Sequence, residues 1–132
     1  MSQENVEAVR RGYEALNRRD IDAWLEGFDA NAEMHDLAEV PDAPVRRGHD
    51  DLREWVAMMD DTWEDGRYEP EEVTETGQFT LVAVRARARG RGSGAPVDFQ
   101  IFHVFEMRDQ KVQRFWAYLD KAKALEAVGL RE

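Results

Sequence analysis

Two ionisable side chains are predicted to face the interior of this chain, where they could exchange protons with a bound molecule. The first is His103, in a segment from Pro96 to Asp120 whose β-branched and aromatic residues predict two long strands joined by a polar turn at 108–110. Side chains alternate along a strand, so His103 shares a face with Phe99, Ile101, Phe105 and Met107. An imidazole in an apolar row indicates either an acid–base group in a pocket or a core histidine with a fixed hydrogen bond.

The second ionisable group is Asp36, near the end of the short predicted strand AEMHDL. Alternation places Ala32, Met34 and Asp36 on the inner face and leaves His35 at the surface. A buried carboxylate is costly unless it finds a hydrogen-bond donor or raises its pKa, so an inward Asp36 favours a functional role. An equally weighted alternative is that Asp36 begins the following proline-containing loop and caps local backbone N–H groups.

Further side chains are expected to line a pocket or to act as secondary candidates. Tyr13 is expected in the core with its hydroxyl at the pocket rim, where it could also bind a ligand. Asp120 ranks lowest, because it lies where it would cap a closing helix. The remaining candidates are Trp24, Met34, Trp55, Met59, Ile101, Phe105, Trp116 and Tyr118.

Helices must position the first half of these residues. Apolar residues recur at three-to-four spacing over 3–17, which predicts an amphipathic helix. Asp20 is a plausible N-cap for a second, shorter helix ending near Phe28. A third helix is expected from an Asp50 N-cap up to Gly66, after a loop with Pro41 and Pro44 that is long enough to cover a pocket mouth.

Long strands follow these helices. The segments 68–76 and 79–91 predict two strands around a Gly77-Gln78 turn. Four arginines, at positions 85, 87, 89 and 91, share one face of the second strand. They could bind an acidic substrate, but they are rather expected to lie on the outer sheet face and pair with carboxylates such as Glu71 or Glu75. The segment after Asp120 predicts a closing helix ended by Gly129.

Composition narrows the possible functions. The 132 residues fit one domain, 1–132, and the formal net charge of −10 argues against nucleic acid or an anionic membrane as a partner. The chain has no cysteine, and the three histidines, at positions 35, 49 and 103, show no metal-ligand spacing. No signal peptide or membrane span is recognisable, so a soluble cytoplasmic protein without cofactor or metal is expected.

The order of elements predicts an α+β fold with helices on one face of a curved, mainly antiparallel sheet that encloses a pocket. This order resembles the SnoaL-like branch of the nuclear transport factor 2 (NTF2-like) superfamily, which includes ketosteroid isomerases and polyketide cyclases. The resemblance covers nearly the whole chain, through YEALNRRDIDAWLEGFDANAEMHD, RRGHDDLREWV, FHVFEMRDQKVQRFWAYLD and ALEAVGL. It implies a cone of three N-terminal helices on the sheet, with a short C-terminal helix.

The resemblance also implies roles for the ionisable residues. Asp36 matches the general-base aspartate of the family's isomerases. His103 stands where these isomerases place a protonated aspartate, which donates a hydrogen bond in their oxyanion hole. Their oxyanion tyrosine matches Gly12, one residue from Tyr13. In the family's cyclases an aspartate or histidine serves as the acid/base.

Two functions are therefore expected as alternatives. The first is a cofactor-independent isomerase or cyclase that acts by acid/base proton transfer on a small apolar carbonyl compound, with Asp36 and His103 as catalytic residues. The second is a non-catalytic ligand-binding or dimerisation module whose cavity is filled by its own side chains. The resemblance further implies a homodimer through the outer sheet face, where Phe102 and Val104 would otherwise need a cover.

Overall fold

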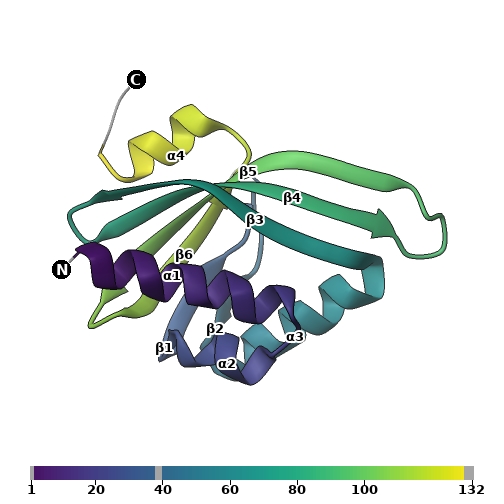
Figure 1. The fold of residues 1–132 in the computed structure, drawn as a ribbon, viewed down its shortest axis with the longest axis horizontal. Coiled ribbons are helices and arrows are strands. Elements are labelled where there is room, and N and C mark those ends of the chain that lie inside the picture. Colours follow the sequence, from purple (N-terminus) through teal and green to yellow (C-terminus); the bar gives the residue numbers. More distant parts are fainter. Residues whose placement is uncertain (1, 38–39, 130–132) are drawn as a thin grey trace.

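The computed structural model describes residues 2–37 and 40–129 as four helices and one six-stranded sheet (Figure 1). Their order is α1 (Ser2–Asn17), α2 (Ile21–Glu26), β1 (Phe28–His35), β2 (Val45–Arg47), α3 (Gly48–Thr62), β3 (Trp63–Thr76), β4 (Phe79–Gly90), β5 (Pro96–Arg108), β6 (Lys111–Tyr118) and α4 (Lys121–Ala127). In space the strands follow the order β2-β1-β6-β5-β4-β3. Only the β1–β6 pair is parallel among the described strands.

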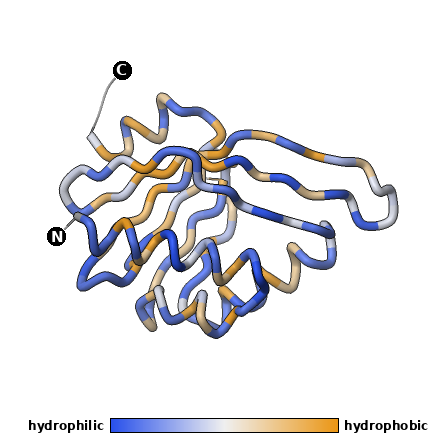
Figure 2. The backbone as a smooth tube through the Cα atoms, in the orientation of Figure 1, coloured by the Kyte–Doolittle hydropathy of each residue, from blue (hydrophilic) through white to orange (hydrophobic). Residues whose placement is uncertain are grey.

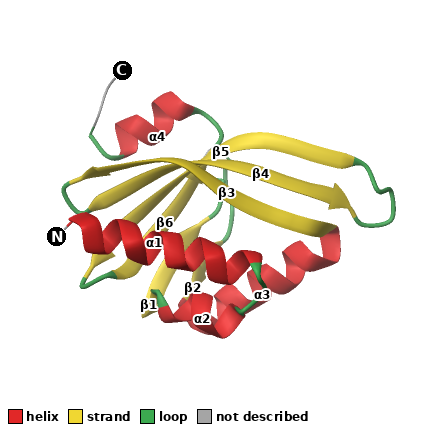
Figure 3. Ribbon diagram, in the orientation of Figure 1, coloured by secondary structure: helices red, strands yellow, loops and turns green. Residues whose placement is uncertain are grey.

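The helices lie on two sides of the sheet. Helices α1, α2 and α3 cover one face, and α4 lies on the other (Figures 1 and 3). The expected α+β fold, with N-terminal helices on a curved and mainly antiparallel sheet and a short C-terminal helix, is confirmed. None of the helices in the described residues is long and apolar enough to cross a membrane.

The main core fills the space between the three N-terminal helices and the inner face of the sheet. Leu52 in α3 and Val82 and Val84 in β4 are fully buried, and so is Ala117 in β6. Full burial of a valine or leucine side chain stabilises a fold by about 1.5–3 kcal/mol. Figure 2 shows hydrophobic segments concentrated in the central strands. This core therefore fixes the sheet face on which His103 lies.

A second, smaller core lies on the outer face of the sheet. Phe102 and Val104 are buried there against Ala124 and Val128 of the C-terminal helix segment. Helix α4 thus provides the cover that these two residues were expected to obtain from a second copy of the chain. The homodimer stays a prediction that rests on the resemblance alone.

Several element ends differ from the sequence expectation. Helix α3 begins at Gly48, and Asp51, rather than an Asp50 N-cap, accepts a hydrogen bond from the Arg47 N–H (2.9 Å). Gly48 has a φ of 78°, a conformation that suits glycine and that sequence periodicity does not reveal. The third helix ends at Thr62, so Trp63 begins β3, and the predicted extension to Gly66 is wrong. Phe28 likewise begins β1.

Other local predictions are confirmed. The Asp20 carboxylate accepts a hydrogen bond from the Ala23 N–H (3.2 Å) at the start of α2. The Asp120 carboxylate does the same for the Ala122 N–H (2.8 Å) at the start of α4. Each cap satisfies a backbone donor that the first turn of the helix leaves unpaired.

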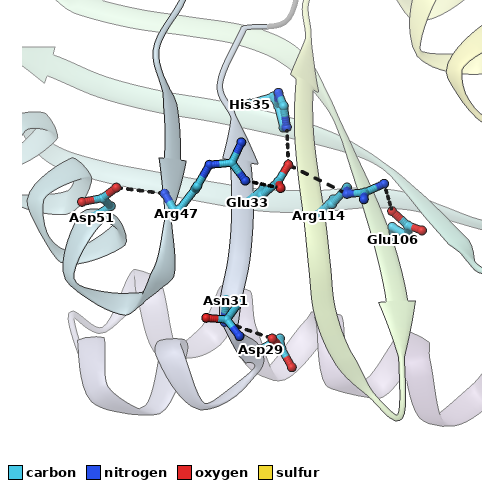
Figure 4. Close-up of polar contacts among 8 residues, drawn as sticks. All are labelled: Asp29, Asn31, Glu33, His35, Arg47, Asp51, Glu106 and Arg114. Atoms are coloured by element: carbon cyan, nitrogen blue, oxygen red, sulfur yellow. Dashed lines mark hydrogen bonds and ion pairs between the residues drawn. The ribbon is translucent and has the colours of Figure 1, made fainter.

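Polar networks tie the strands together on the outer face of the sheet. Figure 4 shows Glu33 of β1 between Arg47 of β2 and Arg114 of β6, with His35 Nε2 3.2 Å from its carboxylate. The predicted pairing of the arginine row with carboxylates is confirmed at Arg85, which lies 3.7 Å from Glu71. The other expected partner, Glu75, instead accepts a hydrogen bond from Asn5 (3.2 Å).

Candidate functional site

An apolar cavity, the inner chamber, lies between α1 and the inner face of the sheet. It has a volume of about 60 Å³. Most of its lining is aliphatic or aromatic, including Met34, Phe105 and Phe115. Four lining side chains also carry titratable groups: Tyr13, Asp36, Tyr68 and His103.

His103 lies in the middle of β5, between Val82 of β4 and Ala117 of β6. Its Nδ1 lies 2.7 Å from the Tyr13 hydroxyl, and the two rings stack with centroids 5.8 Å apart. Burial lowers the pKa of His103 to about 3. Burial and the nearby Tyr68 raise the pKa of Tyr13 well above its ordinary value. At neutral pH this pair therefore consists of a neutral imidazole and a protonated phenol.

The second nitrogen of His103, Nε2, is available for a ligand. Among the described residues, His103 makes one side-chain hydrogen bond, and that bond uses Nδ1. A neutral imidazole carries one N–H and one acceptor nitrogen, so a hydrogen bond donated by Tyr13 to Nδ1 would leave Nε2 as the N–H donor. His103 can thus stabilise an oxyanion without carrying a positive charge.

Asp36 directly follows β1 and faces inward, as alternation predicted. The Trp55 indole N–H donates a hydrogen bond to its Oδ2 (3.2 Å). This contact and the place of Asp36 in the lining of the inner chamber agree with the inward interpretation. Trp55 thus orients one of the two carboxylate oxygens of Asp36.

Tyr68 is a site residue that the sequence analysis missed. Its side chain lines the inner chamber, and its ring centroid lies 5.5 Å from that of His103. Burial, and then the charge of Asp36, raise the pKa of Tyr68 far above its ordinary value, so the hydroxyl stays protonated. The only signal in the sequence was its place at the start of the predicted strand 68–76.

A larger hollow, the vestibule, adjoins the inner chamber. Its volume is about 530 Å³, and its lining includes Met59, Trp63, Val97, Phe99 and Leu119. The two cavities share five lining residues: Leu16, Asp36, Trp55, Tyr68 and Ile101. Phe99 is 42% exposed and Leu119 is 53% exposed, because both lie at this hollow rather than in the core.

The structure brings most of the predicted site residues together. Tyr13, Trp24, Met34, Trp55, Ile101 and Phe105 line the inner chamber with Asp36 and His103, and Met59 lines the vestibule. Trp116 and Tyr118 instead pack against the outer core, because alternation along β6 points Phe115 and Ala117 inward. The expectation that these two aromatics line the pocket is therefore corrected. Asp120 caps α4.

The arrangement suits proton transfer at carbon. One carboxylate, Asp36, and two neutral donors, the Tyr68 phenol and the His103 imidazole, face an apolar space, where hydrogen bonds to a developing oxyanion are stronger than in water. In residues 2–37 and 40–129, no group of three or more His, Asp or Glu side chains is placed to hold a metal ion.

Residues 9–115 match the sequence profile of the SnoaL-like domain. No curated protein sequence matches the chain significantly. Three solved structures illustrate the shared fold. An NTF2-like protein of unknown function from Burkholderia pseudomallei K96243 has 20% identity and a TM-score of 0.79, over 96% of this chain and 98% of that one.

The other two structures carry ligand or activity names. TerC, co-crystallised with polyporic acid, has 23% identity and a TM-score of 0.79 over 95% of this chain and 97% of its own. A protein from Jannaschia sp. CCS1, provisionally named a SnoaL-like polyketide cyclase, has 19% identity and a TM-score of 0.78, over 98% of this chain and 94% of that one. At these identities the likeness establishes the fold.

Proposed function

Because the chain belongs to the SnoaL-like domain family, we propose that it is a cofactor-independent isomerase or cyclase acting on a small, largely apolar carbonyl compound. The observation that carries the proposal is that Asp36 and His103 line one apolar cavity. Packing alone does not require two ionisable groups in such a place. The cyclase name of the Jannaschia relative supports the same class of chemistry.

In this reaction Asp36 acts as the general base. Its carboxylate removes a proton from the carbon next to the carbonyl, and the C–H electron pair forms an enolate. His103 donates its N–H to the enolate oxygen as a neutral imidazole, because its lowered pKa excludes the imidazolium.

Two outcomes follow from the enolate. In an isomerase, the protonated Asp36 returns the proton to another carbon of the conjugated system. In a cyclase, the enolate carbon attacks a second carbonyl of the same molecule, a C–C bond forms, and the resulting alkoxide takes the proton from Asp36.

Exchange of substrate hydrogen for deuterium tests this proposal. A panel of enolisable ketones is incubated with the protein in D₂O, and loss of the C–H signal is followed by NMR. Asp36→Asn is expected to slow exchange by about 10²–10⁴-fold, the usual contribution of a positioned general base. Asp109→Asn is the matched control, because Asp109 is exposed in the β5–β6 turn with a φ of 54° that asparagine tolerates. Unchanged exchange in a folded Asp36→Asn protein would contradict the proposal.

A second function is favoured by a specific observation. Asp36 and His103 each already have a protein hydrogen-bond partner, Trp55 and Tyr13, as expected for a ligand-binding module whose polar groups are structural. Such a module would bind an apolar ketone, detectable as quenching of tryptophan fluorescence, with no deuterium exchange at any concentration. Exchange that depends on Asp36 would exclude it.

A further inference from the structure

Asn17, the last residue of α1, holds the backbone of Tyr68 by two hydrogen bonds. Its side-chain Nδ2 donates to the Tyr68 carbonyl oxygen (2.8 Å), and its Oδ1 accepts from the Tyr68 N–H (2.9 Å). Both the amide nitrogen and the amide oxygen of Asn17 thus form hydrogen bonds with the backbone of one residue, 51 positions away in the chain. This two-point contact reproduces the hydrogen bonds that a neighbouring strand would supply.

The position of Tyr68 in the sheet explains why this contact matters. Strand β3 is the last strand in the sheet order, so among residues 2–37 and 40–129 no strand pairs with its outer edge. Its pairing with β4 is also irregular between Glu64 and Arg67, and Asp65 within this bulge has a φ of 57°. Bulged edges re-aim side chains but are weakly restrained. Asn17 restrains the backbone directly after the bulge.

The side chain held in this way stands at the junction of the two cavities. Of the five residues that line both the inner chamber and the vestibule, Asp36 and Tyr68 are the two with side-chain oxygen atoms. The other three are Leu16, Trp55 and Ile101. A substrate that spans both cavities therefore passes a carboxylate and a phenol at this junction. The protonated Tyr68 hydroxyl can donate a hydrogen bond, whereas the carboxylate can accept a proton.

We infer that Tyr68 is a catalytic residue that donates its hydroxyl hydrogen bond to the substrate carbonyl oxygen, opposite Asp36, and that Asn17 is the residue that positions it. The inference rests on the proposed function, since it adds a second donor to the oxygen that His103 contacts. Removing one donor from such an oxyanion site typically costs about 10²–10³-fold in rate.

A pair of probes separates hydrogen-bond donation from packing. 4-Nitrophenolate presents an oxyanion like that of the enolate, and nitrobenzene is a neutral aromatic of nearly the same shape. All proteins carry Asp36→Asn, which mimics the protonated carboxyl present when the enolate exists and removes its repulsion of the phenolate. Binding of both probes is measured by absorbance and fluorescence titration.

Tyr68→Phe is expected to weaken 4-nitrophenolate binding by about 100-fold and to leave nitrobenzene binding within about twofold. Asn17→Ala is expected to weaken phenolate binding by about tenfold in the same selective way. Asn31→Ala, at an exposed position of β1, is the matched control and should change neither affinity. An equal loss for both probes, or no loss, would overturn the catalytic role of Tyr68.

The double variant Tyr68→Phe, Asn17→Ala tests whether Asn17 acts through Tyr68. If Asn17 only positions the hydroxyl, the double variant binds phenolate no more weakly than Tyr68→Phe alone. Additive losses would make Asn17 a general structural residue and would refute the positioning role. If Tyr68→Phe did not fold, the selectivity of Asn17→Ala between the two probes would still decide the inference.

Failure of the proposed function would look different. If the protein binds phenolate through Tyr68 but exchanges no deuterium, the hydrogen-bond donation by Tyr68 is supported and the proposed reaction is contradicted. If exchange depends on Asp36 but neither its rate nor the phenolate affinity changes in Tyr68→Phe, the proposed reaction is supported and the role of Tyr68 is contradicted.

Discussion

The hydroxyl of Tyr13 lies 2.7 Å from His103 Nδ1, although the two residues are 90 positions apart in the chain. This contact joins the C-terminal half of α1 to the centre of the sheet inside the main core. It fixes the orientation of the imidazole, so that Nε2 rather than Nδ1 is left for a ligand. The helix layer therefore takes part in defining the site as well as covering it.

Removing the Tyr13 hydroxyl should destabilise the protein. Tyr13→Phe leaves Nδ1 buried without a partner, which costs about 1–3 kcal/mol in the free energy of unfolding. Chemical denaturation monitored by circular dichroism measures this loss. In a His103→Leu background the same substitution should cost less or even stabilise the fold, because the hydroxyl itself is then unpaired. An equal cost in both backgrounds would show that the hydrogen bond does not contribute.

Burial of His103 should make stability depend on pH. The lowered pKa, about 3, means that the unfolded chain binds a proton near its ordinary pKa of 6.5 that the folded chain does not bind. The free energy of unfolding therefore falls as pH decreases below about 6.5, with a slope of up to about 1.4 kcal/mol per pH unit for this one proton. Denaturation between about pH 7 and about pH 5 measures the slope. His103→Leu should flatten it, and an equal slope in that variant would contradict the assignment.

Glu33 should affect stability in a more acidic range. The hydrogen bond with His35, followed by contacts with Arg47 and Arg114, lowers the pKa of Glu33 (Figure 4). A carboxylate with a lowered folded pKa stabilises the fold above its ordinary pKa, near 4.5, and this contribution is lost as pH falls through the folded value. Glu33→Gln should therefore be less stable than the wild type at neutral pH and lose less stability on acidification below about pH 4.5.

The matched control for Glu33 is Glu72→Gln, at an exposed position of β3. Because Glu33 is partly exposed, the difference between the variants should be small and should shrink at high salt. If the free energy of unfolding falls equally on acidification in the wild type and in Glu33→Gln, the network of Figure 4 does not stabilise the native state.

Side-chain alternation was enough to predict the two central site residues. His103 lies on a strand and Asp36 directly follows one, the period of two is visible in the sequence of both segments, and both side chains line the inner chamber. The N-caps Asp20 and Asp120 were predictable for a similar reason, since a cap depends only on the next few residues. Local rules succeed where the contact itself is local.

The remaining site residues depend on contacts that are distant in sequence. Tyr68 follows a bulge in β3 and is held by the Asn17 amide, and neither feature has a local signature in the sequence. The second half of β6, which contains Trp116 and Tyr118, carries apolar residues on both faces. The second apolar face serves the outer core beneath α4, which periodicity alone could not distinguish from a pocket.

Thr80 offers a test of the polar interior beside the site. Its side chain is fully buried in β4, and no hydrogen-bond partner for its hydroxyl is found within the described residues. Its register partner Glu75 has the other buried oxygen without a partner in that part of the chain. Thr80→Val keeps the branched shape and removes the unpaired hydroxyl, so the free energy of unfolding should stay equal or rise by about 1 kcal/mol.

Thr62→Val is the control for this substitution. The Thr62 hydroxyl donates to the Met58 carbonyl oxygen (3.1 Å), so its loss should lower the free energy of unfolding by about 0.5–1 kcal/mol. A loss larger than about 1 kcal/mol in Thr80→Val would show that the hydroxyl is hydrogen-bonded in solution.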